Sequence, residues 1–381
     1  MEQNSQNEKS VETNKIERFF NVRWTKIKSM KGKDWLNFFL NNAIIFVLII
    51  FLIIIAIIAA NQKSPINIFS ITNIFFIIEN SARDMFLALG VGGIIILTGT
   101  DLSAGRILGF TSIFSIALLQ SSTFSSSYTE SMKVFKGITA FPVPVVMLIV
   151  MIIGGIFGVI NGFFVAKFKL HPFIVTLATG FMILGFAGIV ASWGRDPVAN
   201  PITAYTKFAD DIIGYHIELF GQPLHIYVFI AIFAIIFTWF LWNYTTFGKN
   251  MYAVGCNPEA ATVSGINVNK TIILVFMYAG ILYGFSGFLY GSWAGSTSAK
   301  IAMPTGQNFE LYAIAACVIG GISFTGGIGK ISGAVIGVLV LDWLTYGLSK
   351  IGITGFTSQI FSGAIILFAV TLDMRKYIVK R

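Results

Sequence analysis

The sequence predicts an all-α fold, a polytopic membrane bundle of about ten transmembrane helices, each needing about 20 apolar residues. Three observations support this fold class. The 381 residues are 55% hydrophobic and only 11% charged, whereas a soluble domain contains about 25% charged residues. The mean hydropathy is +0.79. Basic residues gather at the two ends of the chain, outside the apolar runs.

Hydropathy places the predicted spans along the chain. The first run, residues 38–60, contains no charged residue and is long enough to cross a bilayer. The other predicted spans are 85–97, 107–119, 143–165, 173–192, 226–242, 272–293, 311–324, 332–348 and 358–372. The second, third and eighth spans are short and interrupted by glycine, a pattern that indicates discontinuous helices beside a transport pathway.

The positions of lysine and arginine predict which segments face the cytoplasm. Because positively charged flanks stay inside, residues 1–34 and 374–381 are expected to be cytoplasmic tails of a transmembrane domain over residues 35–373. An inside N-terminus puts three lysine-bearing loops on the same side, at 167–169, 244–270 and 326–330. The expected location is the cytoplasmic membrane, surrounded by lipid. The net charge of +9 belongs to such segments and does not indicate a nucleic-acid partner.

Glycine spacing predicts close contacts between helices. Glycines recur four residues apart at Gly154, Gly158 and Gly162, and again at Gly280 and Gly284. Helix backbones approach closely at such positions, which favours packing in a membrane. Segments 92–109 and 320–337 also share a Gly-Gly-Ile start and an internal Thr-Gly pair. This similarity favours two related halves around a central pathway.

Residues 98–106, Thr-Gly-Thr-Asp-Leu-Ser-Ala-Gly-Arg, place an acid and a base within a membrane-embedded run. An ionisable group in hydrocarbon costs about 3 kcal/mol, so Asp101 and Arg106 require partners, water or a position at the membrane edge. Asp101 either lines a pathway or stabilises a broken segment, by pairing with Arg106 or by capping the next helix at Leu102. The capping preference of Asp favours the structural role. The candidate pathway or gate residues are Thr98, Thr100, Asp101, Ser103, Arg106 and Glu310.

Several chemistries are disfavoured by what the chain contains. The glycine-rich segment 325–332 lacks nucleotide-loop spacing, because Phe324 and Ile331 stand where Gly and Ser or Thr are required. Catalytic motifs of hydrolases are missing from the sequence, so an enzyme is not expected. The histidines and the two cysteines lack metal-ligand spacing, so no metal is expected. Only Asp101, Glu310 and Asp342 qualify as intramembrane acids, which disfavours a proton-driven carrier.

The most specific hydrophilic segment predicts a short cytoplasmic helix. Asn257 can cap it, with Pro258 as the first residue and Glu259 in the first turn. Gly265 then ends the helix. The small residues Ala260, Ala261 and Ser264 are expected to face a partner's groove.

Three segments carry a resemblance to a known family: 98–106, 255–267 and 310–321. Together they resemble the permease subunit of bacterial sugar ABC importers of the ribose/galactose group. Thr100 favours the galactose/methyl galactoside type over the ribose type. The resemblance runs from about residue 36 to the C-terminus. Cys256 departs from it, since many relatives have Gly there.

The resemblance implies a division of labour among subunits. A second copy of the permease would complete the membrane part, a separate cytoplasmic ATPase would bind ATP and Mg, and an extracytoplasmic binding protein would deliver the sugar. This chain itself would bind no cofactor. The implied ATPase-coupling residues are Gly255, Asn257, Pro258, Glu259, Ala260, Ala261, Ser264 and Gly265. Galactose or methyl galactoside is the expected cargo, with ribose, xylose or a nucleoside as alternatives. An ion-coupled secondary sugar carrier and a membrane structural subunit are the alternatives from other classes.

Overall fold

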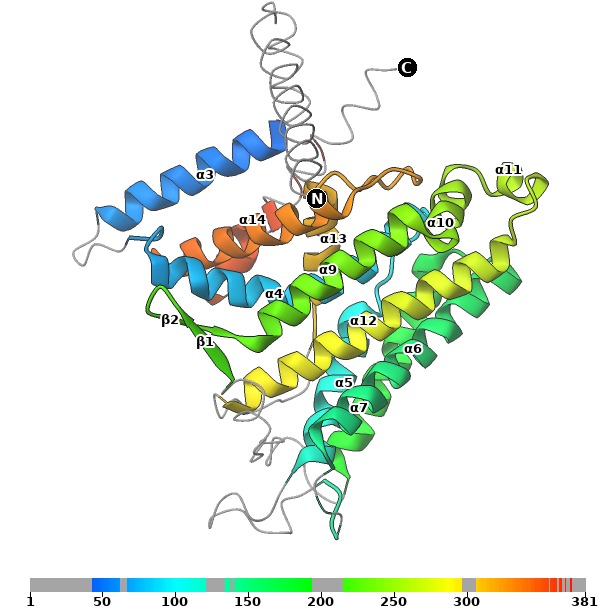
Figure 1. Cartoon of the computed structure of the whole chain (residues 1–381), viewed down its shortest axis with the longest axis horizontal. Coiled ribbons are helices and arrows are strands. Elements are labelled where there is room, and N and C mark those ends of the chain that lie inside the picture. Colours follow the sequence, from blue (N-terminus) through cyan, green and yellow to red (C-terminus); the bar gives the residue numbers. More distant parts are fainter. Residues whose placement is uncertain are drawn as a thin grey trace, which may run out of the picture.

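The computed structural model describes residues 43–61, 67–120, 134–137, 139, 141–193, 215–296, 306–355, 357–361, 363, 364, 367 and 371. Helices dominate these residues (Figure 1). In chain order the elements are α3 (Ala43–Ala60), α4 (Ile71–Ile96), α5 (Ala104–Leu119), α6 (Val143–Phe168), α7 (Pro172–Ser192), β1 (His216–Leu219), β2 (Gln222–His225), α9 (Ile226–Tyr244), α10 (Thr246–Cys256), α11 (Pro258–Val263), α12 (Val268–Ser296), α13 (Phe309–Ile319) and α14 (Ile331–Lys350). The predicted tails at 1–34 and 374–381, and about half of the tenth predicted span, lie outside the described residues.

The fold is a polytopic membrane bundle, as the hydropathy predicts. Among the described helices, five are long and apolar enough to cross a bilayer, namely α6, α7, α9, α12 and α14. Their outward faces carry large apolar side chains, such as Phe181 on α7 and Phe233 on α9, which are 67% and 68% exposed. Such faces suit contact with lipid. The short third and eighth spans are confirmed, because α5 has 16 residues and α13 has 11.

The second predicted span is wrong in length. Helix α4 has 26 residues and begins at Ile71, not at residue 85. Ser70 caps it by accepting a hydrogen bond from the backbone N–H of Asn73 at 3.4 Å. Polar residues in its first half lower the hydropathy and hide the helix from that measure. At about 1.5 Å per residue, α4 is about 39 Å long. From Ser81 onward α4 is almost wholly buried, so its polar residues Ser81 and Arg83 face protein rather than lipid.

The predicted glycine contacts join α6 to α12. A Cβ added at Gly154 would lie 3.0 Å from the backbone nitrogen and the Cα of Gly284. Gly158 is equally tight against the backbone of Phe276 and Met277. These positions tolerate no side chain, so the two backbones are in direct contact. In Figure 1, α6 and α12 run side by side along the molecule.

A small β-hairpin interrupts the helical pattern before α9. Strand β1 pairs antiparallel with β2, and His216 lies opposite His225. Phe220 and Gly221 form the turn, both with positive φ, at 54° and 71°. Two such residues fit the turn type that matches the twist of paired strands. The sequence analysis did not predict this hairpin, which is only four residues long in each strand.

Candidate functional site

The segment 97–103 is a break between α4 and α5. Helix α4 ends where the N–H of Thr98 donates to the carbonyl of Ile95, and that of Gly99 to the carbonyl of Ile94, both at 2.9 Å. Thr98 has a left-handed backbone, with φ of 63°, and its side chain is exposed. The chain then turns into the bundle before α5 starts at Ala104.

Asp101 is buried in this break, with 1% of its surface exposed. Its Oδ1 accepts hydrogen bonds from the backbone N–H of Ser103 at 2.9 Å and from the Ser103 hydroxyl at 2.6 Å. The Asn161 amide of α6 donates to that hydroxyl at 2.8 Å. Of the two predicted structural contacts, the pairing with Arg106 is not the one seen at Oδ1, which binds Ser103 directly before α5. Helix α5 begins two residues later than the predicted start, so the carboxylate braces the turn that precedes it.

The break is also fastened to α7. The backbone N–H of Leu102 donates to the Thr176 hydroxyl at 3.0 Å. That hydroxyl makes its shortest contact with the Pro172 carbonyl, at 2.9 Å, and also lies 3.3 Å from the carbonyl of Thr100. A second α7 residue, Thr179, donates to the Asn161 side chain at 2.6 Å. Helices α6 and α7 thus hold the break in one conformation through buried polar contacts.

Glu310 meets α5 from the other side. It lies in the first turn of α13 and is 8% exposed. A Cβ added at Gly105 would overlap the Glu310 carboxylate and the Gly306 carbonyl, so α13 starts against the start of α5. Arg106 and Glu310 interact electrostatically without a direct ion pair. The structure thus brings Asp101, Ser103 and Glu310 close to one point, whereas Thr98 lies at the opposite edge of the break.

Three segments meet at the end of α4, and we call this meeting point the junction (Ile96, Thr98, Gly255, Gly326 and Gly327). The N–H of Gly327 donates to the Ile96 carbonyl at 2.8 Å. A Cβ at Gly255 would overlap that carbonyl oxygen, and one at Gly326 would overlap the Thr98 methyl group. The two Thr-Gly pairs of the internal similarity, in the α4–α5 and α13–α14 loops, are therefore neighbours.

Helix α10 supplies one side of the junction and was not predicted as a separate helix. Its Tyr252 hydroxyl donates to the Gly329 carbonyl at 3.0 Å. Burial raises the pKa of Tyr252 to about 12, so the hydroxyl keeps its proton at neutral pH. The α13–α14 loop is therefore attached to α10 as well as to α4.

The predicted short helix is α11, which follows directly. The Asn257 side chain accepts hydrogen bonds from the N–H groups of Glu259 at 2.9 Å and Ala260 at 3.0 Å. Gly265 ends the segment, with φ of 82°. Figure 1 shows α11 at one corner of the molecule. Ala261 is buried, so the prediction that it faces a partner is wrong. Val263, which the sequence analysis did not select, is 89% exposed.

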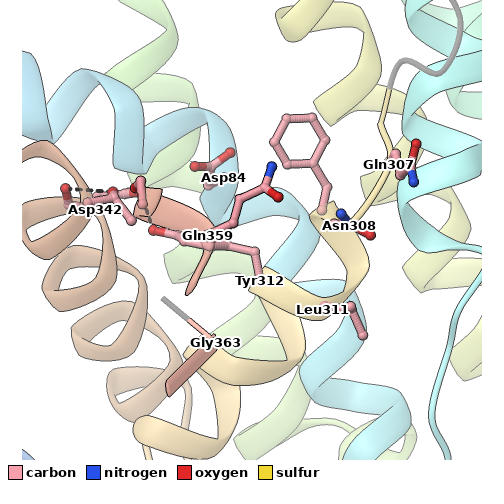
Figure 2. A pocket seen from close by; sticks show the side chains of 11 residues that line it. Asp84, Gln307, Asn308, Leu311, Tyr312, Asp342, Gln359 and Gly363 are labelled. Carbon is pink, nitrogen blue, oxygen red and sulfur yellow. Dashed lines mark hydrogen bonds between the residues drawn. The ribbon is translucent and has the colours of Figure 1, made fainter. Parts of the chain in front are cut away.

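A cavity of about 490 Å³ lies between α4, α13, α14 and the segment that carries Ser358, Gln359 and Gly363 (Figure 2). Asp84, Tyr312 and Asp342 line it, and the Tyr312 hydroxyl donates to Asp342. Asp84 was not among the predicted intramembrane acids, because the predicted span began at residue 85. With Asp84 included, the number of intramembrane acids no longer disfavours a proton-driven carrier.

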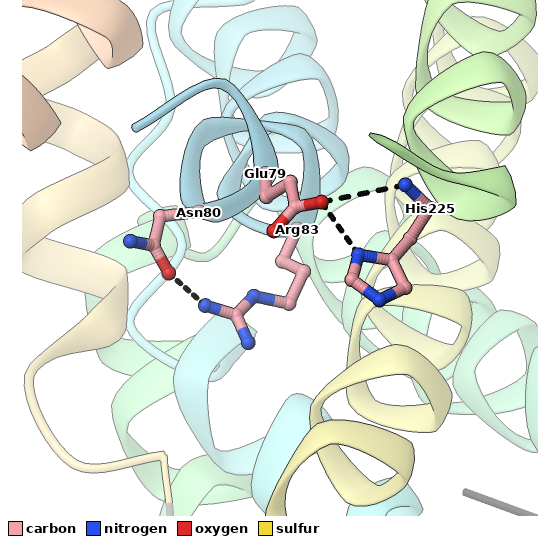
Figure 3. Close-up of polar contacts among 4 residues, drawn as sticks. All are labelled: Glu79, Asn80, Arg83 and His225. Atoms are coloured by element: carbon pink, nitrogen blue, oxygen red, sulfur yellow. Dashed lines mark hydrogen bonds and ion pairs between the residues drawn. The ribbon is translucent and has the colours of Figure 1, made fainter. Parts of the chain in front are cut away.

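A second polar cluster fastens the β-hairpin to α4 (Figure 3). The Glu79 carboxylate binds both the backbone N–H of His225, at 3.3 Å, and its ring Nδ1, at 2.5 Å. One turn further along α4, Arg83 donates to the Asn80 side chain. These contacts give His225 a structural role. Among the described residues, no group of three acids, histidines or cysteines could hold a metal ion.

The structure is that of an integral membrane permease. It combines long apolar helices with two short helices that start inside the bundle and with a buried polar break. Comparison with known families agrees with this class. Residues 73–370 match the family described as "Branched-chain amino acid transport system / permease component". The chain belongs to this family of permeases.

Individual relatives are similar over nearly their whole length. The chain is 36% identical to the galactose/methyl galactoside import permease protein MglC of Escherichia coli (strain K12), over 93% of this chain and 100% of the relative. It is 38% identical to MglC of Haemophilus influenzae, over 89% and 96%. Identity to the ribose import permease protein RbsC of Escherichia coli (strain K12) is 32%, over 86% and 93%. No solved structure matches the chain.

Proposed function

We propose that this chain is the permease subunit of an ATP-driven importer for galactose or methyl galactoside, working by alternating access. The observation that carries this proposal is the likeness to MglC, which spans the whole of that relative. Ribose is the second candidate, because the chain is also 32% identical to RbsC. A non-catalytic role follows, with ATP and Mg bound by a separate ATPase subunit.

The exposed helix α11 is the proposed contact with that ATPase. Val263 and Glu259 face outward, while Ala261 anchors the helix to the bundle. Behind α11, the junction joins α10 to the end of α4 and to the α13–α14 loop. A displacement of α11 would therefore be passed to the break at 97–103 through direct backbone contacts. Such close-packed contacts move together instead of deforming.

The orientation of the chain follows from the loops that share an end of the bundle. Three loops lie at one end of the bundle: α6–α7, α10–α11 and α13–α14. Gly99 in the break packs near Pro172 at the start of α7, and the junction joins the break to the α10–α11 region and to the α13–α14 loop. All three carry lysine. We assign this end to the cytoplasm of the inner membrane, along with both termini. The hairpin end then faces the sugar-binding protein.

For the buried break we propose a structural role in the gate. Asp101 and Ser103 fix its conformation, and Glu310 holds α13 against it. The resemblance to sugar importers further leads us to propose a homodimer of permeases, with the pathway near the paired copies.

Uptake by a reconstituted complex tests the proposed cargo. The full chain is placed in liposomes with the ATPase and the sugar-binding protein of its own transport system, and radiolabelled galactose is supplied outside. We expect uptake that excess methyl galactoside blocks and excess ribose or leucine leaves almost unchanged. Blocking by ribose alone would assign the chain to the second candidate, and blocking by leucine would reject a sugar as cargo.

A further inference from the structure

The cavity lined by Asp84, Tyr312 and Asp342 is built from groups that lie near the middle of long helices. Asp84 is near the midpoint of α4, and Asp342 is near the midpoint of α14. Another wall is formed by Gln307 and Asn308, which precede α13, and by its first residue, Phe309. In transporters made of discontinuous helices, substrate sites lie near the bilayer midplane where such helices start. The cavity occupies such a place.

The cavity contains unused hydrogen-bonding capacity. Asp342 is 7% exposed, and its Oδ1 accepts a hydrogen bond from Tyr312, whereas its Oδ2 meets no described group in good hydrogen-bond geometry. The Ser81 hydroxyl and the Asp84 carboxyl are its other polar neighbours. Asp84 is near enough to interact with it directly. A buried acceptor left unsatisfied is unfavourable, so a donor supplied by a ligand would stabilise it. Two adjacent carboxylates therefore favour a ligand that brings several hydrogen-bond donors.

The remaining lining groups can both donate and accept. Amides come from Gln307, Asn308 and Gln359, and hydroxyls from Thr345 and Ser358. Figure 2 shows the Gln359 side chain reaching toward Asp84. Phe309 and Leu311 add an apolar part. The volume, about 490 Å³, falls within the about 300–1,000 Å³ of small-molecule sites. A sugar ring presents this same combination of hydroxyls and apolar C–H edges.

We propose that this cavity binds a neutral, polyhydroxylated ligand, a hexose, during its passage through the permease. The inference rests on the proposed function and specifies where the cargo is held. The carboxylate end of a free amino acid fits poorly beside Asp84 and Asp342, although its ammonium end would be attracted to them. A bare cation also fits poorly, since it requires six or more oxygen ligands at close range, and Tyr312 already occupies one Asp342 oxygen.

Protection of a reporter cysteine tests this site. In the full transport complex, with the exposed Cys256 replaced by Ser, we would introduce Thr345→Cys or Ser358→Cys in the cavity. Ser349→Cys, exposed and one turn beyond Thr345 on α14, is the matched control. Galactose at about ten times its dissociation constant should slow modification of the cavity reporters about tenfold, as occupancy of a single site requires. The control should react at an unchanged rate.

Variants of the two acids in the cavity provide a second test. Adding Asp342→Asn or Asp84→Asn should abolish protection at the cavity reporters, while Ser349→Cys remains unaffected. Equal protection by Na⁺ or Mg²⁺ without sugar would overturn the proposal in favour of a cation. Unchanged reaction with galactose, or no reaction at either reporter, would also overturn it. If uptake of galactose persists in those cases, the proposed function stands and only this site is wrong; loss of uptake in the unmodified complex would reject the function itself.

Discussion

Asp101 shows how one buried carboxylate can stabilise a break in a membrane helix. Its Oδ1 satisfies the N–H and the hydroxyl of Ser103, which in turn holds Asn161 of α6. The sequence indicated that Asp101 needed a partner but could not identify it, because Asn161 is 60 residues away and reaches Ser103 only through the fold. The same motif did suffice to show the resemblance to a family.

We expect Asp101→Ala to lower the free energy of unfolding by about 1–3 kcal/mol, because it leaves the Ser103 groups unsatisfied in a buried place. Asp101→Asn keeps an oxygen acceptor and should cost less. Denaturant unfolding of the purified permease measures both. Neither variant should change which sugar is taken up. If Asp101→Asn assembled fully but altered sugar preference, Asp101 would line the pathway instead.

Gly255 should be intolerant of a side chain, because a Cβ there overlaps the Ile96 carbonyl. We expect Gly255→Ala to push α10 away from α4 and to reduce ATPase stimulation by the loaded binding protein. The matched control is Gly185→Ala on α7, where the added Cβ meets nothing within 4 Å. Replacing that helical Gly should even favour the helix, by up to about 1 kcal/mol. ATP hydrolysis in nanodiscs compares the two variants, and equal stimulation would contradict the role of the junction.

At the level of elements, the sequence predicted a helix well where neighbouring residues in the chain determine its ends. Helix α11 lies where its capping residue, Pro and Gly place it. Helix α4 was truncated because hydropathy treats every residue as if it faced lipid, whereas Glu79 contacts His225 of the β-hairpin and Asp84 lines the cavity beside α13 and α14. The hairpin was missed since its strands are short and are held by Glu79 from a distant part of the chain. The cavity could not be predicted, because it forms only where distant helices pack together. One of its acids, Asp84, also lay outside the predicted span.

Helix α11 should bind the ATPase through its outward face. We expect Glu259→Lys to leave the permease inserted but to weaken co-purification of the ATPase subunit and to uncouple its stimulation. The first turn of a helix favours an acid over a base, so a lysine at position 259 is unfavourable for α11 itself. The reversed charge at this position would also face the ATPase. Glu218→Lys, the same change at an exposed position on the hairpin, should leave co-purification intact. Equal loss in both variants would point to misfolding rather than to a docking site.

At the level of the whole molecule, the native cysteines report orientation. Cys256 is exposed next to α11, and Cys317 is buried against α4. Without the ATPase bound, a membrane-impermeant maleimide should label Cys256 in inside-out vesicles and not in right-side-out ones. A Glu218→Cys reporter on the hairpin, with Cys256 replaced by Ser, should show the reverse. Labelling of Cys256 from the outside would invert the proposed topology.

The energy source of uptake tests the central claim most directly, that this permease is one subunit of an ATP-driven importer. Proteoliposomes with the full complex are loaded with ATP, and accumulation of radiolabelled galactose is followed with and without an ionophore that collapses ion gradients. We expect accumulation that requires internal ATP and external binding protein and continues in the presence of the ionophore. Accumulation without ATP that the ionophore abolishes would contradict the claim and identify an ion-coupled carrier.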